Sequence, residues 1–234
     1  MIYVLGFTVP WDAALHLDGV GPNAHVWGLL SVLLSKAGIL NIATAFNAVL
    51  GAGILFALVG AWLRTWGAAY LGAGVVQNAK MQGDGVVAEG PFGYVRNPLY
   101  LGMWLHTLAL ALLMPVSGAI FTTILVAVFQ VRLIVGEEGF LRTKLGAQYA
   151  AYCARVPRLV PALRARAASA GARPQWLQAF SGEIYMWGVA GSFAVAGWQY
   201  NAQLLIKCVL VSLGVSMVVR ALTMKEQPAV QVPR

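Results

Sequence analysis

The sequence has few charged residues. Only 10% of its 234 residues are charged, whereas an ordinary soluble domain carries about 25%. Apolar residues make up 59% of the chain, and they fall in long unbroken runs rather than at amphipathic spacing. Such runs are typical of membrane-spanning helices. The composition therefore argues against a soluble protein and predicts an integral membrane protein.

The sequence also has little cysteine and no evident leader. Cys153 and Cys208 are far apart and have no metal-ligand spacing, so neither a disulfide framework nor a zinc site is indicated, and we expect no metal. The first residues, 1–11, lack a basic n-region and a small-residue cleavage site. A cleavable signal peptide is therefore not expected.

The formal net charge is +8, which could indicate a nucleic-acid partner. In a membrane protein such a balance more often reflects basic loops on the cytoplasmic face. We favour this second interpretation and expect no nucleic acid among the partners.

The apolar runs predict an all-α integral membrane protein, a bundle of about five to six transmembrane helices. The predicted spans are residues 42–63, 99–114, 116–135, 184–199 and 204–219. Residues 24–40 are apolar but include Lys36, so they are either a sixth span or an interfacial segment. The chain then divides into N-terminal apolar segments (1–41), a core (42–163), a basic linker (164–182) and a C-terminal pair of spans with a tail (183–234).

Two of these spans form a short helical hairpin around Pro115 and Gly118. Both ends of a hairpin emerge on the same side of the membrane, so the polar stretches 65–97 and 137–182 share one face. The second stretch carries seven basic residues against two glutamates before residue 182. The positive-inside rule therefore predicts that this face is cytosolic, in a multi-pass protein of the bacterial inner-membrane type.

The first polar cluster is residues 89–102, which read Glu-Gly-Pro-Phe-Gly-Tyr-Val-Arg-Asn-Pro-Leu-Tyr-Leu-Gly. Gly90, Pro91 and Gly93 are expected to preclude a helix and to give a tight loop with backbone N–H groups free to bind a ligand. Arg96 and Asn97 stand just before an intramembrane helix, where they are placed to hold a polar cofactor. The alternative is a plain loop with a snorkelling arginine and an interfacial tyrosine.

The second cluster begins with Glu137 and Glu138 at the end of a span. Carboxylates there are costly unless they are solvated, paired or bound to a ligand. Because they are adjacent, they point to different sides of a helix, and we expect them to have separate roles. Tyr149 and Tyr152 lie three apart on one helical face. The alternatives are a solvated helix end for the glutamates and an aromatic belt for the tyrosines.

Together the clusters resemble the isoprenylcysteine carboxyl methyltransferase and phospholipid methyltransferase families. Those families have a Gly-x-Tyr-x-x-x-Arg-His-Pro-x-Tyr-x-Gly loop, a membrane hairpin, and then Glu-Glu-x-x-Leu-x-x-x-x-Gly-x-x-Tyr-x-x-Tyr-x-x-Arg-Val-Pro-x-x-x-Pro. The second pattern is matched from Glu137 to Pro161, and the resemblance covers residues 63–161.

The resemblance implies a pocket for S-adenosylmethionine on the cytosolic loops. The family's cofactor contacts fall on Gln77, Asp84, Gly85, Val86, Val87, Phe92, Asn97, Pro98, Leu99, Tyr100 and Glu137. It also implies catalytic roles for Arg132 and Glu137, and substrate contacts at Arg132 and Trp104. A Gly-x-Gly signature of the phospholipid enzymes is similar to residues 72–74, where a helix end is the favoured alternative.

Three departures from the family pattern bear on the site. Asn97 stands where the family usually has His, and Phe92 stands where it often has Tyr. The arginine usually four residues before the first glutamate is displaced, because Leu133 occupies that position and the nearest arginine is Arg132. On a helix Arg132 lies about 140° around from Glu137.

The implied function is methyl transfer to a lipophilic or amphipathic acceptor, with membrane lipids as surroundings. Neither motif contains His, and His106 is mid-helix, which favours an acceptor that is already anionic, such as a carboxylate or thiolate of a prenyl-type or lipid substrate. Trp104, Phe129 and Phe140 would suit an apolar chain. Two alternatives stay open, namely an NADPH-dependent reductase of the sterol-reductase type and a non-catalytic membrane protein.

Overall fold

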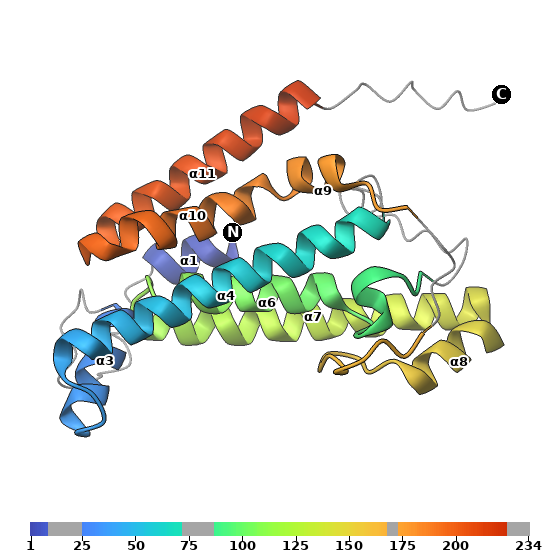
Figure 1. Cartoon of the computed structure of the whole chain (residues 1–234), viewed down its shortest axis with the longest axis horizontal. Coiled ribbons are helices and arrows are strands. Elements are labelled where there is room, and N and C mark those ends of the chain that lie inside the picture. The colour runs from blue at the N-terminus through green and yellow to red at the C-terminus, as the bar shows by residue number, and fades with distance from the viewer. Residues whose placement is uncertain (9–24, 72–86, 168–172, 224–234) are drawn as a thin grey trace.

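A computed structural model describes residues 1–8, 25–71, 87–167 and 173–223. Within these ranges the chain is helical and has no strand, and its long helices run roughly along one axis (Figure 1). In this described part of the chain, three helices are long and apolar enough to cross a membrane: α4 (Ile42–Leu71), α7 (Val116–Leu145) and α11 (Ala202–Thr223). The protein is therefore an all-α membrane protein, as predicted.

Helix α4 is the centre of the bundle. Its 30 residues extend about 45 Å, more than the roughly 30 Å of a bilayer's hydrocarbon core. It packs closely on α6 (Pro98–Ala111) because glycines face each other: a Cβ added to Gly60 would lie 2.7 Å from the carbonyl oxygen of Gly102. In a bilayer the hydrophobic effect does not drive helices together, so close packing at small residues becomes an important source of helix association.

The predicted hairpin is present, formed by α6 and α7 (Figure 1). Helix α6 ends at Ala111, three residues before the expected end. The backbone N–H groups of Leu112, Leu113 and Met114 each donate to the carbonyl three residues earlier, which tightens the chain into the turn before Pro115. With 14 residues, about 21 Å, α6 is too short to cross a bilayer alone.

The N-terminal elements cover the end of the bundle at which the hairpin turns. Helix α1 (Ile2–Thr8) packs on α7, and α3 (Val26–Lys36) is held to the turn because Val26 N–H donates to the Met114 carbonyl over 3.0 Å. Helix α3 has 11 residues, about 16 Å, which supports the interfacial alternative for this part of the chain.

The C-terminal helices are α9 (Trp176–Gly182), α10 (Ile184–Ala196) and α11, with the 3₁₀ turn η2 (Gly197–Gln199) between α10 and α11. Helix α10 packs on α4, and α11 packs mainly on α10. One buried ion pair fastens them to the core: Arg64 Nε and Nη2 each donate to a carboxylate oxygen of Glu183 over 2.7 Å. Trp187 Nε1 also donates to Thr65 Oγ1 over 2.9 Å.

Candidate functional site

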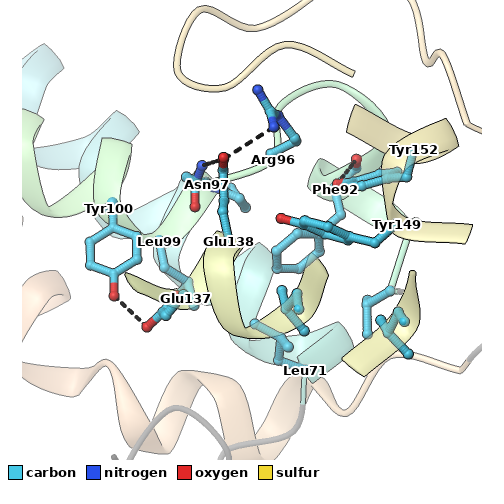
Figure 2. A pocket seen from close by; sticks show the side chains of 14 residues that line it. Leu71, Phe92, Arg96, Asn97, Leu99, Tyr100, Glu137, Glu138, Tyr149 and Tyr152 are labelled. Atoms are coloured by element: carbon cyan, nitrogen blue, oxygen red, sulfur yellow. Dashed lines mark hydrogen bonds and ion pairs between the residues drawn. The ribbon is translucent and has the colours of Figure 1, made fainter. Parts of the chain in front are cut away.

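A pocket lies at the end of the bundle opposite α3, beside α8 (Figure 1), where segments far apart in the sequence meet (Figure 2). The end of α4 contributes Leu71, the end of α7 contributes both glutamates, and α8 (Ala147–Arg155) contributes both tyrosines. The lining residues are Leu71, Val87, Phe92, Arg96, Asn97, Pro98, Leu99, Tyr100, Glu137, Glu138, Leu141, Leu145, Tyr149 and Tyr152. The pocket is thus mostly apolar, with a few convergent polar groups, as small-molecule sites usually are.

The loop before α6 is shaped by the short 3₁₀ helix η1 (Gly90–Gly93). Gly90 has φ +58°, and a Cβ there would lie 2.4 Å from the ring of Tyr70, so only glycine fits. The loop is held from α8, because the Tyr152 hydroxyl donates to the Phe92 carbonyl over 2.8 Å. This contact orients the buried Phe92 ring toward the pocket (Figure 2).

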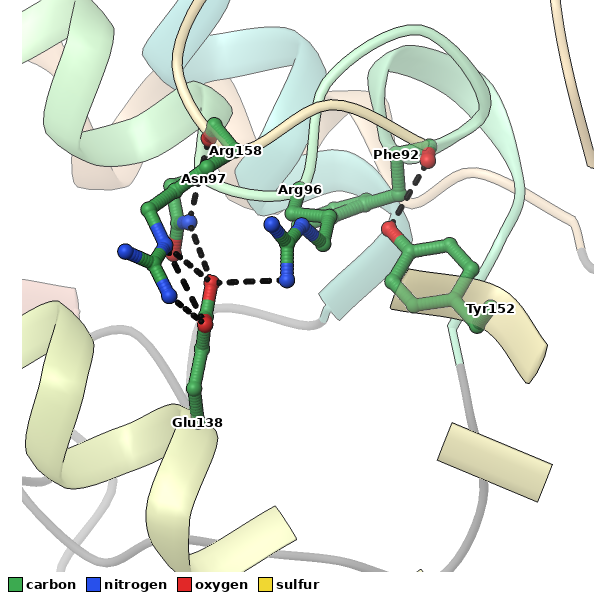
Figure 3. A network of polar contacts seen from close by, with 6 residues as sticks. All are labelled: Phe92, Arg96, Asn97, Glu138, Tyr152 and Arg158. Atoms are coloured by element: carbon green, nitrogen blue, oxygen red, sulfur yellow. Dashed lines mark hydrogen bonds and ion pairs between the residues drawn. The ribbon is translucent and has the colours of Figure 1, made fainter. Parts of the chain in front are cut away.

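Glu138 is the centre of a polar network that joins three segments (Figure 3). Its carboxylate accepts from Arg158 Nη2 over 2.7 Å and from Asn97 Nδ2 over 3.3 Å. Arg96 Nη1 lies 3.2 Å from Oε1, an ion pair without hydrogen-bond geometry. Asn97 Nδ2 also donates to the Arg158 carbonyl over 3.1 Å. Glu138 therefore binds the loop, α7 and the chain after α8 to one another.

Glu137 points elsewhere. Its carboxylate accepts a hydrogen bond from the Tyr100 hydroxyl over 2.5 Å, on the α6 side of the pocket (Figure 2). The expectation that the two glutamates face different sides of the helix is met. Both carboxylates border the cavity, but Glu138 is engaged by the network, whereas Glu137 accepts from the neutral Tyr100 hydroxyl.

The electrostatics of the pocket wall follow from burial and pairing. Burial raises the pKa of Tyr149 and of Tyr152, so both hydroxyls stay neutral at physiological pH. Their rings pack with centroids 5.8 Å apart and form one wall. The hydrogen bonds to Glu138 raise the pKa of Arg158, which therefore remains charged.

The structure brings together the predicted cofactor residues that it describes. Seven of them line the pocket: Val87, Phe92, Asn97, Pro98, Leu99, Tyr100 and Glu137. Gln77, Asp84, Gly85 and Val86 lie outside the described residues, as does the run 72–74. Arg132 and Trp104 do not line the pocket: Arg132 is exposed on α7, and Trp104 is 36% exposed on α6.

Sequence reasoning named no pocket role for three leucines. Leu141 and Leu145 continue the helical spacing from Glu138 and form the α7 wall, a signal that the i, i+3 and i, i+4 rule could have supplied. Leu71 lies at the end of α4, and its proximity depends on the tertiary fold. Among the described residues, no group of His, Cys, Asp and Glu could hold a metal ion, and no histidine lines this pocket.

Comparison with known proteins identifies the segment that builds most of this pocket. Residues 48–148 match the family model of phospholipid methyltransferases. The match runs from α4 through the loop and the hairpin to the start of α8, and it confirms the family resemblance. No curated protein and no solved structure matches the chain.

Proposed function

We propose that this chain transfers the methyl group of S-adenosylmethionine to a lipophilic acceptor. The match of residues 48–148 to a family of membrane methyltransferases supports the reaction type. One observation supports the proposal above the others. The seven described residues on which the cofactor contacts were expected border a single pocket, although they come from two separate stretches of the chain, residues 87–100 and Glu137 on α7. We also propose that the pocket faces the cytosol, since basic residues dominate the loops around it.

The residues present fit this cofactor. The Glu137 carboxylate suits the ammonium of the methionine moiety or the ribose hydroxyls. The buried rings of Phe92 and Tyr149 provide aromatic faces for the adenine and for the positive charge of a sulfonium. Asn97 donates to Glu138 and to the Arg158 carbonyl, so we assign it to positioning the loop. This assignment accounts for an amide where the family usually has an imidazole.

The catalytic work left to the protein is alignment. S-adenosylmethionine supplies a methyl group that is already activated as a sulfonium. Glu137 and its partner Tyr100 fix one end of the pocket, and the apolar walls exclude water. Holding two reactants in line accounts for a large part of such a barrier. Because no histidine in the described part of the chain lines the pocket, we propose an acceptor that is already anionic, a carboxylate or thiolate.

We further propose that the acceptor reaches the pocket from the bilayer. The pocket includes the first residues of α6, which places it at the level where the hairpin enters the membrane. Trp104, Phe129 and Phe140 expose apolar surface on the two hairpin helices. Burying an apolar tail contributes about 0.8 kcal/mol per methylene. With one headgroup and graded tails, we expect kcat/KM to rise steeply with tail length, mainly through KM. Full activity on a short, water-soluble acid or thiol would contradict lateral access.

Calorimetry on protein in lipid nanodiscs tests the donor site. The wild type should bind S-adenosylmethionine, or its demethylated product, in the micromolar range. Glu137→Gln should weaken this at least tenfold, because charge-assisted hydrogen bonds contribute about 1.5–3 kcal/mol. Glu183→Gln is the control, the same change at a buried carboxylate outside the pocket.

Two results would count against the proposal. Unchanged binding in Glu137→Gln would remove Glu137 from the site. Absence of binding by the wild type, together with binding of NADPH, would favour the reductase alternative.

A further inference from the structure

The chain that follows α8 carries a feature that the methyl-transfer proposal does not use. Residues 157–166, which we call the hook, read Pro-Arg-Leu-Val-Pro-Ala-Leu-Arg-Ala-Arg and are neither helix nor strand. Three backbone hydrogen bonds hold them to the pocket loop: Arg96 N–H to the Pro157 carbonyl (2.8 Å), Ala162 N–H to the Tyr94 carbonyl (2.9 Å) and Arg166 N–H to the Gly93 carbonyl (2.8 Å). The hook therefore has a fixed shape.

The apolar side chains of the hook point away from the protein. Leu159 is 37% exposed, Val160 78% and Leu163 99%. Burial of apolar side chains of this size is favourable, so a rigid segment that exposes three of them is poorly suited to water. The same segment exposes Arg158, Arg164 and Arg166. Apolar residues flanked by arginines are the composition of elements that lie in a membrane interface.

The direction of the hook agrees with this composition. In Figure 1 the chain leaves α8, runs back along the long axis toward the middle of the bundle, and then turns. The helices that are long and apolar enough to cross a membrane run along this same axis. The turn of the hook is therefore the part of this region that comes nearest to the membrane level.

We propose that the hook is an interfacial anchor of the pocket. Leu159, Val160 and Leu163 insert into the leaflet on the pocket side, and Arg164 and Arg166 bind the headgroups of anionic phospholipids. Arg158 extends the effect to the site, since it pairs with Glu138 in the pocket wall. The lipid surface thus holds the wall from outside while the Glu138 network holds it from inside. The proposal concerns the bilayer as ligand and does not depend on catalysis.

Fluorescence quenching tests the anchor directly. Leu163→Cys, in a background with Cys153→Ala and Cys208→Ala, is labelled with an environment-sensitive dye and placed in nanodiscs of phosphatidylcholine with or without phosphatidylglycerol. The control is Gln148→Cys, exposed on α8. At Leu163 we expect quenching by nitroxides on the lipid chains and several-fold protection from iodide relative to Gln148. Removing phosphatidylglycerol, or the change Arg164→Gln, should weaken the protection, on the order of fivefold per arginine contact.

Two outcomes would overturn the inference. Equal iodide quenching at Leu163 and Gln148, without lipid quenching, would show that the hook lies in water. Protection that appears in native membranes but not in nanodiscs of the purified protein would make a protein partner the occupant. Val160→Cys, at the other exposed apolar position of the turn, provides a second probe if the Leu163 label perturbs the segment.

Discussion

Two buried glutamates, one at the pocket and one at the joint between the core and the C-terminal helices, have different surroundings. Glu138 at the pocket is 3% exposed, and Glu183 at the start of α10 is 4% exposed. Glu138 receives three side chains from two other segments, whereas Glu183 receives one arginine in a bidentate pair. Glu138 borders a cavity, whereas Glu183 holds the start of α10 to α4 through its ion pair with Arg64.

The comparison teaches that a buried carboxylate in a membrane protein does not by itself mark a site. Charges inside a membrane are expensive, and both glutamates meet that cost through arginine partners. The distinguishing features at the pocket are the neighbouring cavity and a second carboxylate, Glu137, outside the network. We therefore assign Glu138 and Glu183 to architecture and Glu137 to ligand binding.

The largest effect is expected from Glu138→Ala. It leaves Arg96 and Arg158 facing each other without their carboxylate, and removing one partner of a buried pair costs about 3–5 kcal/mol. Thermal unfolding in detergent should show a large fall in stability, and donor binding should fall with it because the loop and α8 lose their common anchor. A stable variant with intact donor binding would show that the network does not hold the wall.

Glu183→Ala should have a slightly smaller effect on stability, about 3 kcal/mol, because it strands only Arg64. Donor affinity, measured at a temperature where the variant is folded, should stay within about twofold of wild type, since neither residue lines the pocket. A tenfold loss of donor affinity would contradict the assignment of Glu183 to architecture alone and would make the C-terminal helices part of the site.

The smallest effect is expected from two single hydrogen bonds. Tyr152→Phe removes the donor to the Phe92 carbonyl, and Trp187→Phe removes the donor to Thr65. Each should lower the free energy of unfolding by about 1 kcal/mol. Only Tyr152→Phe should also weaken donor binding, because only it orients the pocket loop. Equal binding losses in both variants would indicate a general loosening rather than a local one.

Hydropathy predicted where the helices lie better than where they end. The predicted spans 42–63 and 116–135 lie within α4 and α7, which continue to Leu71 and Leu145. A helix continues past its apolar run wherever its backbone bonds can still form, so an apolar run marks the membrane-embedded part and not the whole helix. At α10 the expected span to residue 199 ends as an α-helix at Ala196, and its last three residues form the 3₁₀ turn η2.

The site was predictable to the extent that its residues are close in sequence. The glycines and proline of residues 90–93 predicted a tight loop without a helix, but the structure forms the short 3₁₀ helix η1 there, because Pro91 is tolerated in its first turn. The adjacency of Glu137 and Glu138 correctly predicted that they point to different sides of α7. Pairing across the chain was beyond reach: Arg64 and Glu183 are 119 residues apart, and Asn97 and Arg158 are 61 apart. Only the tertiary fold shows that Asn97 is engaged by the network, and the assignments of Arg132 and Trp104 remain predictions.

The most direct test of the central claim is transfer of label from methyl-labelled S-adenosylmethionine to an extracted lipid fraction by the protein in nanodiscs. The account predicts label in the organic phase with wild type and with Glu183→Gln, and at least a tenfold lower rate with Glu137→Gln at subsaturating donor. A panel of acceptors with carboxylate, thiol and amine headgroups then assigns the acceptor class. Label transfer that is unchanged by Glu137→Gln, or no transfer to any lipid by the wild type, would contradict it.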